Sequence, residues 1–321
     1  MKKYLFYIVA LPFLYQKVYS NINTGLIAEN ILQRESSVEL LSDSPTFNQH
    51  DSTLNDMGNI SSLKWYTMFQ KIPGDWVQAW KVTVSPDNLP TMAGITALTV
   101  AMIATDRPVW ERADDLYRGS RTARGASDFF VYLGDGRPQF GLSLAFATYG
   151  FAASDNRALL TASQITEVIL SCGTVVQVLK HITGRESPIV STRRNGRWKF
   201  FPNQLEYHRR VPHFDAFPSG HIATSLATLT VILENYPETK PWLQPLGYTI
   251  VSAIGISLVN KGIHWWSDFP LGIYLGYHFG KIVSHPAAFS GDKEQNESSS
   301  RLIFTPSISP WGNGLGLSYT F

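Results

Sequence analysis

The sequence predicts an all-α protein, a helical bundle that is followed by a short C-terminal β hairpin. Three observations lead to this prediction. Apolar segments with helical spacing alternate with polar loops from Thr91 to about Val283. Hydrophobic residues make up 44% of the 321 residues and charged residues only 16%, so the chain can bury a large core. Near the C-terminus the apolar spacing changes to the period of two that is typical of strands.

The first twenty residues are typical of a secretory signal peptide. Lys2 and Lys3 precede an uncharged apolar stretch from Tyr4 to Tyr15, and Val18 and Ser20 supply the small residues of a cleavage site. The alternative is an uncleaved anchor helix, for which the apolar stretch is short. Either interpretation predicts an exported protein of the periplasm or cell envelope.

Composition divides the remaining chain into four parts. We expect a variable polar leader over residues 21–62, a helical domain over 63–284, a linker over 285–301 and a β-like tail over 302–321. In the tail, Leu315, Leu317 and Tyr319 alternate with small or polar residues after turn-forming Pro310. A strand packed on the domain is favoured over a strand of an outer-membrane barrel, because one hairpin cannot close a barrel.

The helices of the domain are predicted from six apolar segments. These are Met92–Ala104, Gln139–Ala152, Leu160–His181, Ile222–Glu234, Leu246–Val259 and Phe269–Val283. Within the third segment, a stripe that includes Ile165, Val168, Cys172 and Val176 follows the spacing of one buried helix face. Gly184 is placed to end this helix. The only cysteine, Cys172, is therefore interpreted as a buried apolar residue.

The lengths of the apolar runs and the net charge bear on whether the chain spans a membrane or binds nucleic acid. The uninterrupted apolar runs are shorter than the roughly 20 residues that a membrane span needs, and the mean hydropathy is −0.07. We therefore expect a globular bundle that rests on a membrane surface rather than a polytopic protein. The aromatic segment Trp65–Trp80 fits core packing or contact with lipid. A net charge of +2 argues against a general nucleic-acid binder.

Three clusters carry residues suited to phosphate chemistry, namely Lys180–Pro188, Phe217–His221 and His264–Asp268. In the second cluster, Ser219 and Gly220 follow a proline at a predicted helix start. Free backbone amides and the helix dipole favour an anion there, and glycine allows close approach of the anion. Lys180 adds a positive charge. These residues are the predicted phosphate-binding groups.

The histidines of these clusters suggest a nucleophile and an acid. His264 and Asp268 are four residues apart, so on a helix they share one face. A carboxylate bonded to one ring nitrogen fixes the tautomer and leaves the other nitrogen free to attack. His221 is then the predicted general acid for the leaving oxygen. We expect His264, His221 and Asp268 to be the catalytic residues.

This set of motifs resembles the signature of the type 2 phosphatidic acid phosphatase superfamily, which includes lipid phosphatases, nonspecific acid phosphatases and vanadium haloperoxidases. The resemblance covers about residues 139–283. It implies a helical bundle of that superfamily's type and a phosphohistidine intermediate that needs neither metal nor cofactor. Two family arginines are replaced, by Ser187 and Leu258. Arg185 lies close in sequence and is expected to help hold phosphate, and Lys261 and the basic loop between the motifs offer further cations.

The leading hypothesis is a hydrolase of phosphomonoesters or pyrophosphates, with a lipid or isoprenoid phosphate as the substrate. The first alternative is a weak or inactive binding or structural protein of the cell envelope, which the two missing arginines favour. The second is a vanadium haloperoxidase or a phosphotransferase. The missing arginines also argue against a haloperoxidase, because vanadate is bound by the same residues as phosphate.

Overall fold

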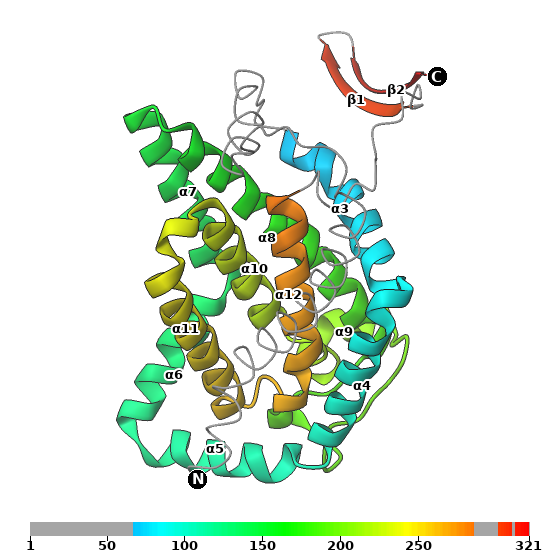
Figure 1. Cartoon of the computed structure of the whole chain (residues 1–321). Helices are drawn as coiled ribbons and strands as arrows, with labels where there is room; N and C mark the ends of the chain where they lie inside the picture. The colour runs from blue at the N-terminus through cyan, green and yellow to red at the C-terminus, as the bar shows by residue number, and fades with distance from the viewer. Residues whose placement is uncertain (1–66, 286–300, 310–311, 321) are drawn as a thin grey trace, which may run out of the picture. The chain divides into compact units, whose positions relative to one another are not determined.

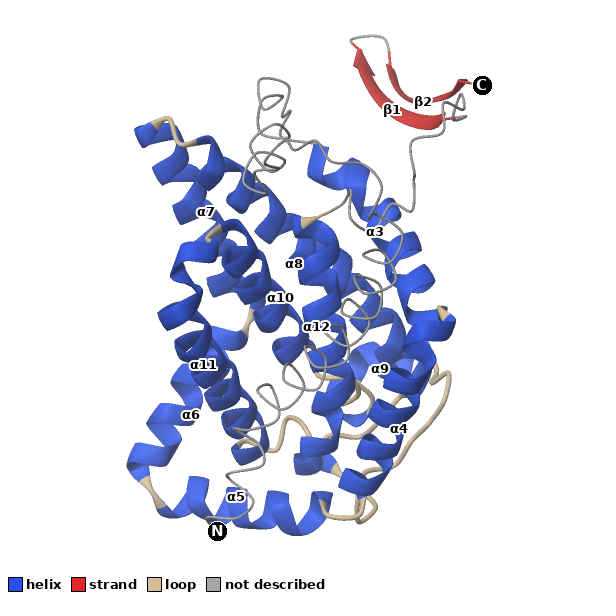
Figure 2. Cartoon of the chain, viewed as in Figure 1, coloured by secondary structure: helices blue, strands red, loops and turns tan. Residues whose placement is uncertain are grey.

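The computed structural model describes residues 67–285, 301–309 and 312–320. The predicted signal peptide, the polar leader and nearly all of the predicted linker lie outside the described residues. Between residues 67 and 285, every element longer than an isolated bridge is a helix (Figure 2). The prediction of a mostly helical domain is therefore confirmed for this part of the chain.

Ten α-helices form this domain (Figure 1). They are α3 (Thr67–Val84), α4 (Leu89–Ile103), α5 (Asp106–Gly119), α6 (Arg121–Gly134), α7 (Gly136–Ala153), α8 (Asn156–Thr183), α9 (Gln204–Arg209), α10 (Gly220–Asn235), α11 (Lys240–Asn260) and α12 (Phe269–Ser284). Short 3-10 helices lie between them: η2 (Pro86–Asn88), η3 (Pro188–Val190), η4 (Val211–His213), η5 (Pro237–Thr239) and η6 (Trp266–Asp268).

Each of the six apolar segments is a helix, but the stretch between the first two differs from the expectation of a polar loop. It folds into α5 and α6. These helices are polar on one side and bury few residues, so a search for apolar runs does not find them. Helix α6 is capped by Ser120, whose hydroxyl accepts a hydrogen bond from the amide of Ala123 at 3.2 Å.

Helix α10 lies between α8, α11 and α12. One group of buried apolar side chains joins it to α11 and α12, and includes Leu226, Ile254 and Phe269. A second group joins it to α8 and α12, and includes the predicted stripe from Ile165 to Val176. Cys172 is fully buried in this second group, as expected. The start of α10 is thus held from several sides.

A row of glycines lets α12 pack closely on α10. A Cβ atom added at Gly272 would lie 2.8 Å from the carbonyl oxygen of Ser219. At Gly276 the added Cβ would lie even closer to the carbonyl oxygen of Ala223. Both distances are shorter than real Cβ contacts, so these positions require glycine.

The end of α8 and the loop after it are fixed by Gly184. This glycine ends α8 in the left-handed conformation, with φ of 54°, and its amide bonds to the carbonyl of Lys180 at 3.0 Å. An added Cβ would collide with the carbonyl oxygen of Lys199. The predicted stop signal is confirmed, and it brings residues 185–216 back across the end of α8.

Helix α8 and the segment Pro237–Asn260 are long and apolar enough to cross a membrane. The bent pair Pro86–Ile103 and Asp106–Gly119 would add a third span if it is counted as one. Large apolar side chains also face outward, among them Trp80 and Leu144, each 68% exposed, and Phe151, 77% exposed. These features support membrane association more strongly than the uninterrupted apolar runs of the sequence did.

The residues Ala287–Phe321 form a separate compact unit. Within it, β1 (Arg301–Ser309) and β2 (Gly312–Thr320) pair antiparallel, with Arg301 opposite Thr320 and Ser309 opposite Gly312. Residues 310–311 lie outside the described residues, so a hairpin turn at this point stays a prediction.

We predict that Gly276→Ala destabilises the domain. The added methyl group would meet backbone at Ala223, and overpacking of this kind costs about 1–3 kcal/mol. Gly141→Ala in α7 is the matched control, because no atom of the described residues beyond its own helix backbone and chain neighbours lies within 4 Å of the added Cβ. That change should be neutral or stabilise by about 0.4–1 kcal/mol. Thermal unfolding of both variants measures the difference, and equal midpoints would contradict the close packing.

Candidate active site

The structure brings the two predicted catalytic histidines together. His221 lies in the first turn of α10, and His264 lies in the loop between α11 and η6. Their ring centroids are 6.0 Å apart and the rings are nearly perpendicular, at 73°. His264 is buried, with 1% of its surface exposed, whereas His221 is partly exposed and lines a cavity.

The tautomer of His264 is set by a backbone carbonyl. Its Nδ1 lies 2.6 Å from the carbonyl oxygen of Ala216 and 3.5 Å from the carboxylate of Asp268. A carbonyl oxygen can only accept a hydrogen bond, so Nδ1 must carry the proton. The lone pair is therefore on Nε2, the nitrogen that a nucleophile needs. His264 and Asp268 do not lie on one helix, because His264 precedes η6.

Asp268 binds two other groups instead. One carboxylate oxygen accepts the amide of Trp265 at 2.7 Å, and the other accepts from the guanidinium of Arg185. The Trp265 amide follows directly on His264, so Asp268 fixes the backbone that carries the histidine. Asp268 thus supports His264 mainly through its neighbours.

Arg185 is fully buried and does not line the cavity. Its guanidinium joins Asp268 to Asp106, which it contacts at 2.6 Å, and it also donates to the hydroxyl of Ser267 at 2.8 Å and the carbonyl of Asn195 at 3.0 Å. Two buried carboxylates thus take up its positive charge. The structure does not bring Arg185 to the position where a phosphate would meet Lys180 and His221.

The phosphate-binding residues predicted from the second motif lie at the start of α10. Gly220 begins the helix and lines the cavity, and the first amides of a helix have no partner within it. The amide of Ser219 is already used, since it donates to the carbonyl of Asp268 at 3.0 Å. Its hydroxyl is buried and has no hydrogen-bond partner among the described residues.

Lys180 reaches the cavity from the end of α8, but it is already paired. Its Nζ lies 3.1 Å from a carboxylate oxygen of Asp215, which also lines the cavity. Sequence reasoning missed Asp215, although it stands four residues before Ser219 and is one of few acids in a basic loop. Lys180 is the one lysine or arginine among the residues that line the cavity in the described part of the chain.

The two positions that depart from the family pattern are buried. Ser187 donates its amide to the carbonyl of Pro212 at 2.8 Å. Leu258 is fully buried among the apolar side chains shared by α10, α11 and α12. Lys261 is no substitute for the missing cations, because it pairs with Asp128 at 2.6 Å and does not line the cavity. An arginine at position 258 would have to displace part of this core.

The cavity that contains Lys180 and His221 has a volume of about 850 Å³. It extends along α8, where apolar Ile169 and Val176 line it, and Phe201 adds an aromatic wall. Burial, together with nearby His264 and Lys180, lowers the pKa of His221 to about 4. The cavity therefore combines a small polar end with a longer apolar side.

Parts of this chain are similar to known proteins. Residues 161–289 match the family model of the PAP2 superfamily. Over 68 residues, 21% of this chain, the sequence is 37% identical to a lipid A 1-phosphatase from Porphyromonas gingivalis, and the match spans 15% of that relative's length. A transmembrane PAP2-type phosphatidylglycerolphosphate phosphatase from Bacillus subtilis is 15% identical, with a TM-score of 0.38 over 72% of this chain and all of that one.

We predict that Asp215→Asn strengthens the binding of vanadate, an analogue of the phosphoryl group. The change keeps the size of the side chain and removes the charge that now occupies Lys180. A charge-assisted hydrogen bond contributes about 1.5–3 kcal/mol, so the inhibition constant should fall about tenfold or more. Glu206→Gln is the control, because Glu206 binds Lys199 at 2.9 Å and does not line the cavity. Weaker or unchanged inhibition for Asp215→Asn would show that Asp215 does not compete with the anion.

Proposed function

We propose, because residues 161–289 match the family model of the PAP2 superfamily, that the chain hydrolyses a lipid-linked phosphomonoester or pyrophosphate through a phosphohistidine at His264. The observation that carries the proposal is the pair of histidines. His264 has its lone pair on Nε2, and His221 is close to it at the edge of the cavity.

In the first step, Nε2 of His264 attacks phosphorus and a P–N bond forms. The bond from phosphorus to the leaving oxygen breaks, and His221 protonates that oxygen. In the second step, His221 takes a proton from water, the resulting hydroxide attacks phosphorus, and the P–N bond breaks. Phosphate leaves and His264 is restored.

The remaining residues have supporting roles in this proposal. Lys180, the Ser219 hydroxyl and the Gly220 amide hold the phosphoryl oxygens. Asp268 positions His264 through the Trp265 amide. Arg185 is a positioning residue rather than a phosphate ligand, because it is buried between Asp106 and Asp268.

A lipid phosphate is the substrate class that the cavity supports best. Its apolar side along α8 can accept a hydrocarbon chain while its polar end receives the phosphate. The long apolar helices support a site in or at a membrane. The relative that is similar to this chain over 68 residues carries the name of a lipid A 1-phosphatase. Export to the periplasm or cell envelope is part of the proposal and depends on the sequence of residues 1–20.

A weakly active or inactive binding protein is the second candidate. The observation that favours it is the ion pair between Lys180 and Asp215, because it neutralises the one lysine or arginine among the described residues that line the cavity. A vanadium haloperoxidase would need to bind its anion more tightly than these residues allow.

We predict phosphate release from short-chain lipid phosphates by the purified protein, at a rate that EDTA leaves unchanged. The proposed cations and donors belong to the chain itself, so no added metal is needed. His264→Ala should abolish release, since no other residue is proposed to take the phosphoryl group. Phosphate release is measured by a colorimetric assay. Loss of activity in EDTA with recovery on adding a divalent cation, or full activity of His264→Ala, would overturn the mechanism.

We also predict that kcat/KM rises as the pH is lowered from 7 towards 4. The lowered pKa of His221 leaves the ring neutral at pH 7 in the free protein, whereas the general acid must carry a proton. Initial rates across this range measure the dependence, and the residual activity of His221→Asn should lose it. A wild-type profile that falls towards low pH would contradict the role of His221.

A further inference from the structure

We propose that a second cavity, between the start of α5 and the loop 191–194, binds a phosphate group, either of a lipid headgroup or as free phosphate. The cavity has a volume of about 520 Å³ and is lined by three residues of α5 (Arg107, Pro108 and Glu111) and by Ser191, Thr192, Arg193 and Arg194. It shares no lining residue with the cavity that contains Lys180 and His221. The inference therefore goes beyond the proposed hydrolysis.

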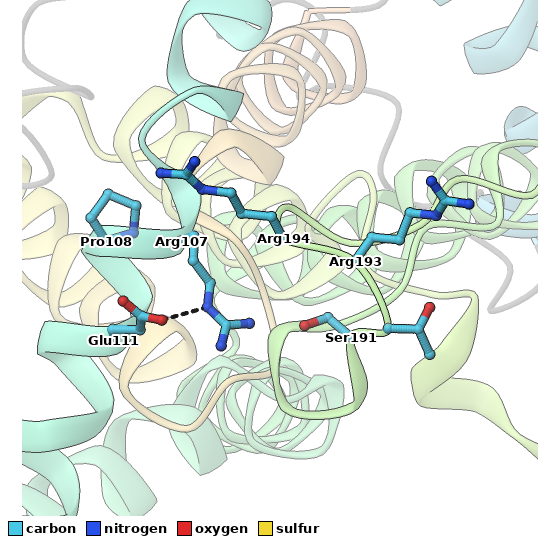
Figure 3. A pocket seen from close by; sticks show the side chains of 7 residues that line it. Arg107, Pro108, Glu111, Ser191, Arg193 and Arg194 are labelled. Atoms are coloured by element: carbon cyan, nitrogen blue, oxygen red, sulfur yellow. Dashed lines mark hydrogen bonds and ion pairs between the residues drawn. The ribbon is translucent and has the colours of Figure 1, made fainter.

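The charge of this cavity suits an anion. The lining contains three arginines and one glutamate, a formal net charge of +2. Glu111 accepts a hydrogen bond from Arg107 at 2.6 Å, but the side chain of Arg107 is 33% exposed and that of Glu111 55%, so this pair adds little stability. Arg193 and Arg194 form no ion pair with other described residues. The charge of Arg194, on the side of the loop that faces α5 (Figure 3), is therefore available to a ligand.

The donors come from two separate elements. Arg107 extends from α5, and Arg194 lies on the side of the loop that faces α5, whereas Arg193 points away from it (Figure 3). The hydroxyl of Ser191 is buried and has no hydrogen-bond partner among the described residues. The guanidinium of Arg107 is held 4.8 Å above the ring of Trp110. The planar guanidinium groups of arginine and a serine hydroxyl are hydrogen-bond donors that suit phosphate oxygens.

Both walls of the cavity are fixed before a ligand binds. On the loop, the amide and the hydroxyl of Thr192 donate to the buried carboxylate of Glu186 at 3.0 and 2.9 Å. At the start of α5, Asp106 precedes Arg107 and binds Arg185 at 2.6 Å. Arg185 also donates to the carbonyl of Asn195, just after the loop. Since Arg185 ties both walls, an anion needs little ordering of the chain to bind.

The position of α5 fits a ligand at a membrane surface. The apolar helix α4 precedes it, and the pair bends by 63° at this point. Helix α5 is strongly polar on one side, which is typical of helices that lie along a membrane surface. Phosphate headgroups are found at that depth.

The test uses the full chain with Lys180→Ala and His264→Ala, so that the proposed active site does not contribute to binding. In this background, inorganic phosphate is titrated by calorimetry in a zwitterionic detergent. We expect Arg107→Gln with Arg194→Gln to weaken phosphate binding at least about tenfold, as expected for lost charge-assisted contacts. The matched control is Arg209→Gln with Arg210→Gln, which removes the same charge from exposed residues that do not line the cavity.

Arg194→Gln alone serves as a second variant, because Arg194 is exposed and its replacement leaves the packing of α5 intact. A second arm uses dihexanoyl phosphatidylglycerol against dihexanoyl phosphatidylcholine. Selective binding of the anionic lipid, lost in the Arg107 and Arg194 variants, identifies a headgroup site; binding of phosphate alone, lost in the same variants, identifies a free-phosphate site. Equal losses in the control pair, or no binding in either arm, would overturn the proposal.

Discussion

The buried guanidinium of Arg185 joins the segment beside His264 to the two segments that form the second cavity. It contacts Asp268 beside His264, Asp106 at the start of α5, and the carbonyl of Asn195 in the loop between the motifs. Burying three charges gives little net stability, but removing one partner leaves a buried charge uncompensated, at a cost of about 3–5 kcal/mol. The network therefore specifies position more than it adds stability. It orients Asp268, which in turn fixes the backbone next to His264.

This use of Arg185 changes the electrostatics of the candidate active site. Arg185, which the sequence suggests as a phosphate-binding cation, is instead paired with two carboxylates. Lys180 is paired with Asp215. Ser187 and Leu258 supply no charge at the family's arginine positions. The groups left to bind phosphate are the first amides of α10 and the Ser219 hydroxyl. Lys180 contributes only to the extent that the anion replaces Asp215 as its partner. The geometry of the two histidines fits the proposed catalysis, while the residues available to bind the anion are few. Acidic conditions or a substrate bound through its lipid chain would offset that weakness.

The sequence predicted the helical domain, the six apolar helices, the buried stripe of α8 and the meeting of three distant motifs. Local spacing was enough for these, since an apolar period or a glycine stop depends on nearby residues. It did not predict α5 and α6, whose pattern is polar, nor the partners of polar groups. The Ala216 carbonyl at His264, the ion pair of Asp215 and the burial of Arg185 all depend on contacts across many residues of sequence. Spacing places a side chain near a site but does not say which of several partners it meets.

The central claim is that His264 receives the phosphoryl group, and trapping that species tests it most directly. The purified protein is mixed with a lipid phosphate, quenched in alkali and digested, and its peptides are examined by mass spectrometry. The account predicts an acid-labile phosphate on the peptide that contains His264, absent from His264→Ala and more abundant in His221→Asn, in which water is activated poorly. Phosphate on a different residue, or turnover without any phosphorylated peptide, would contradict it.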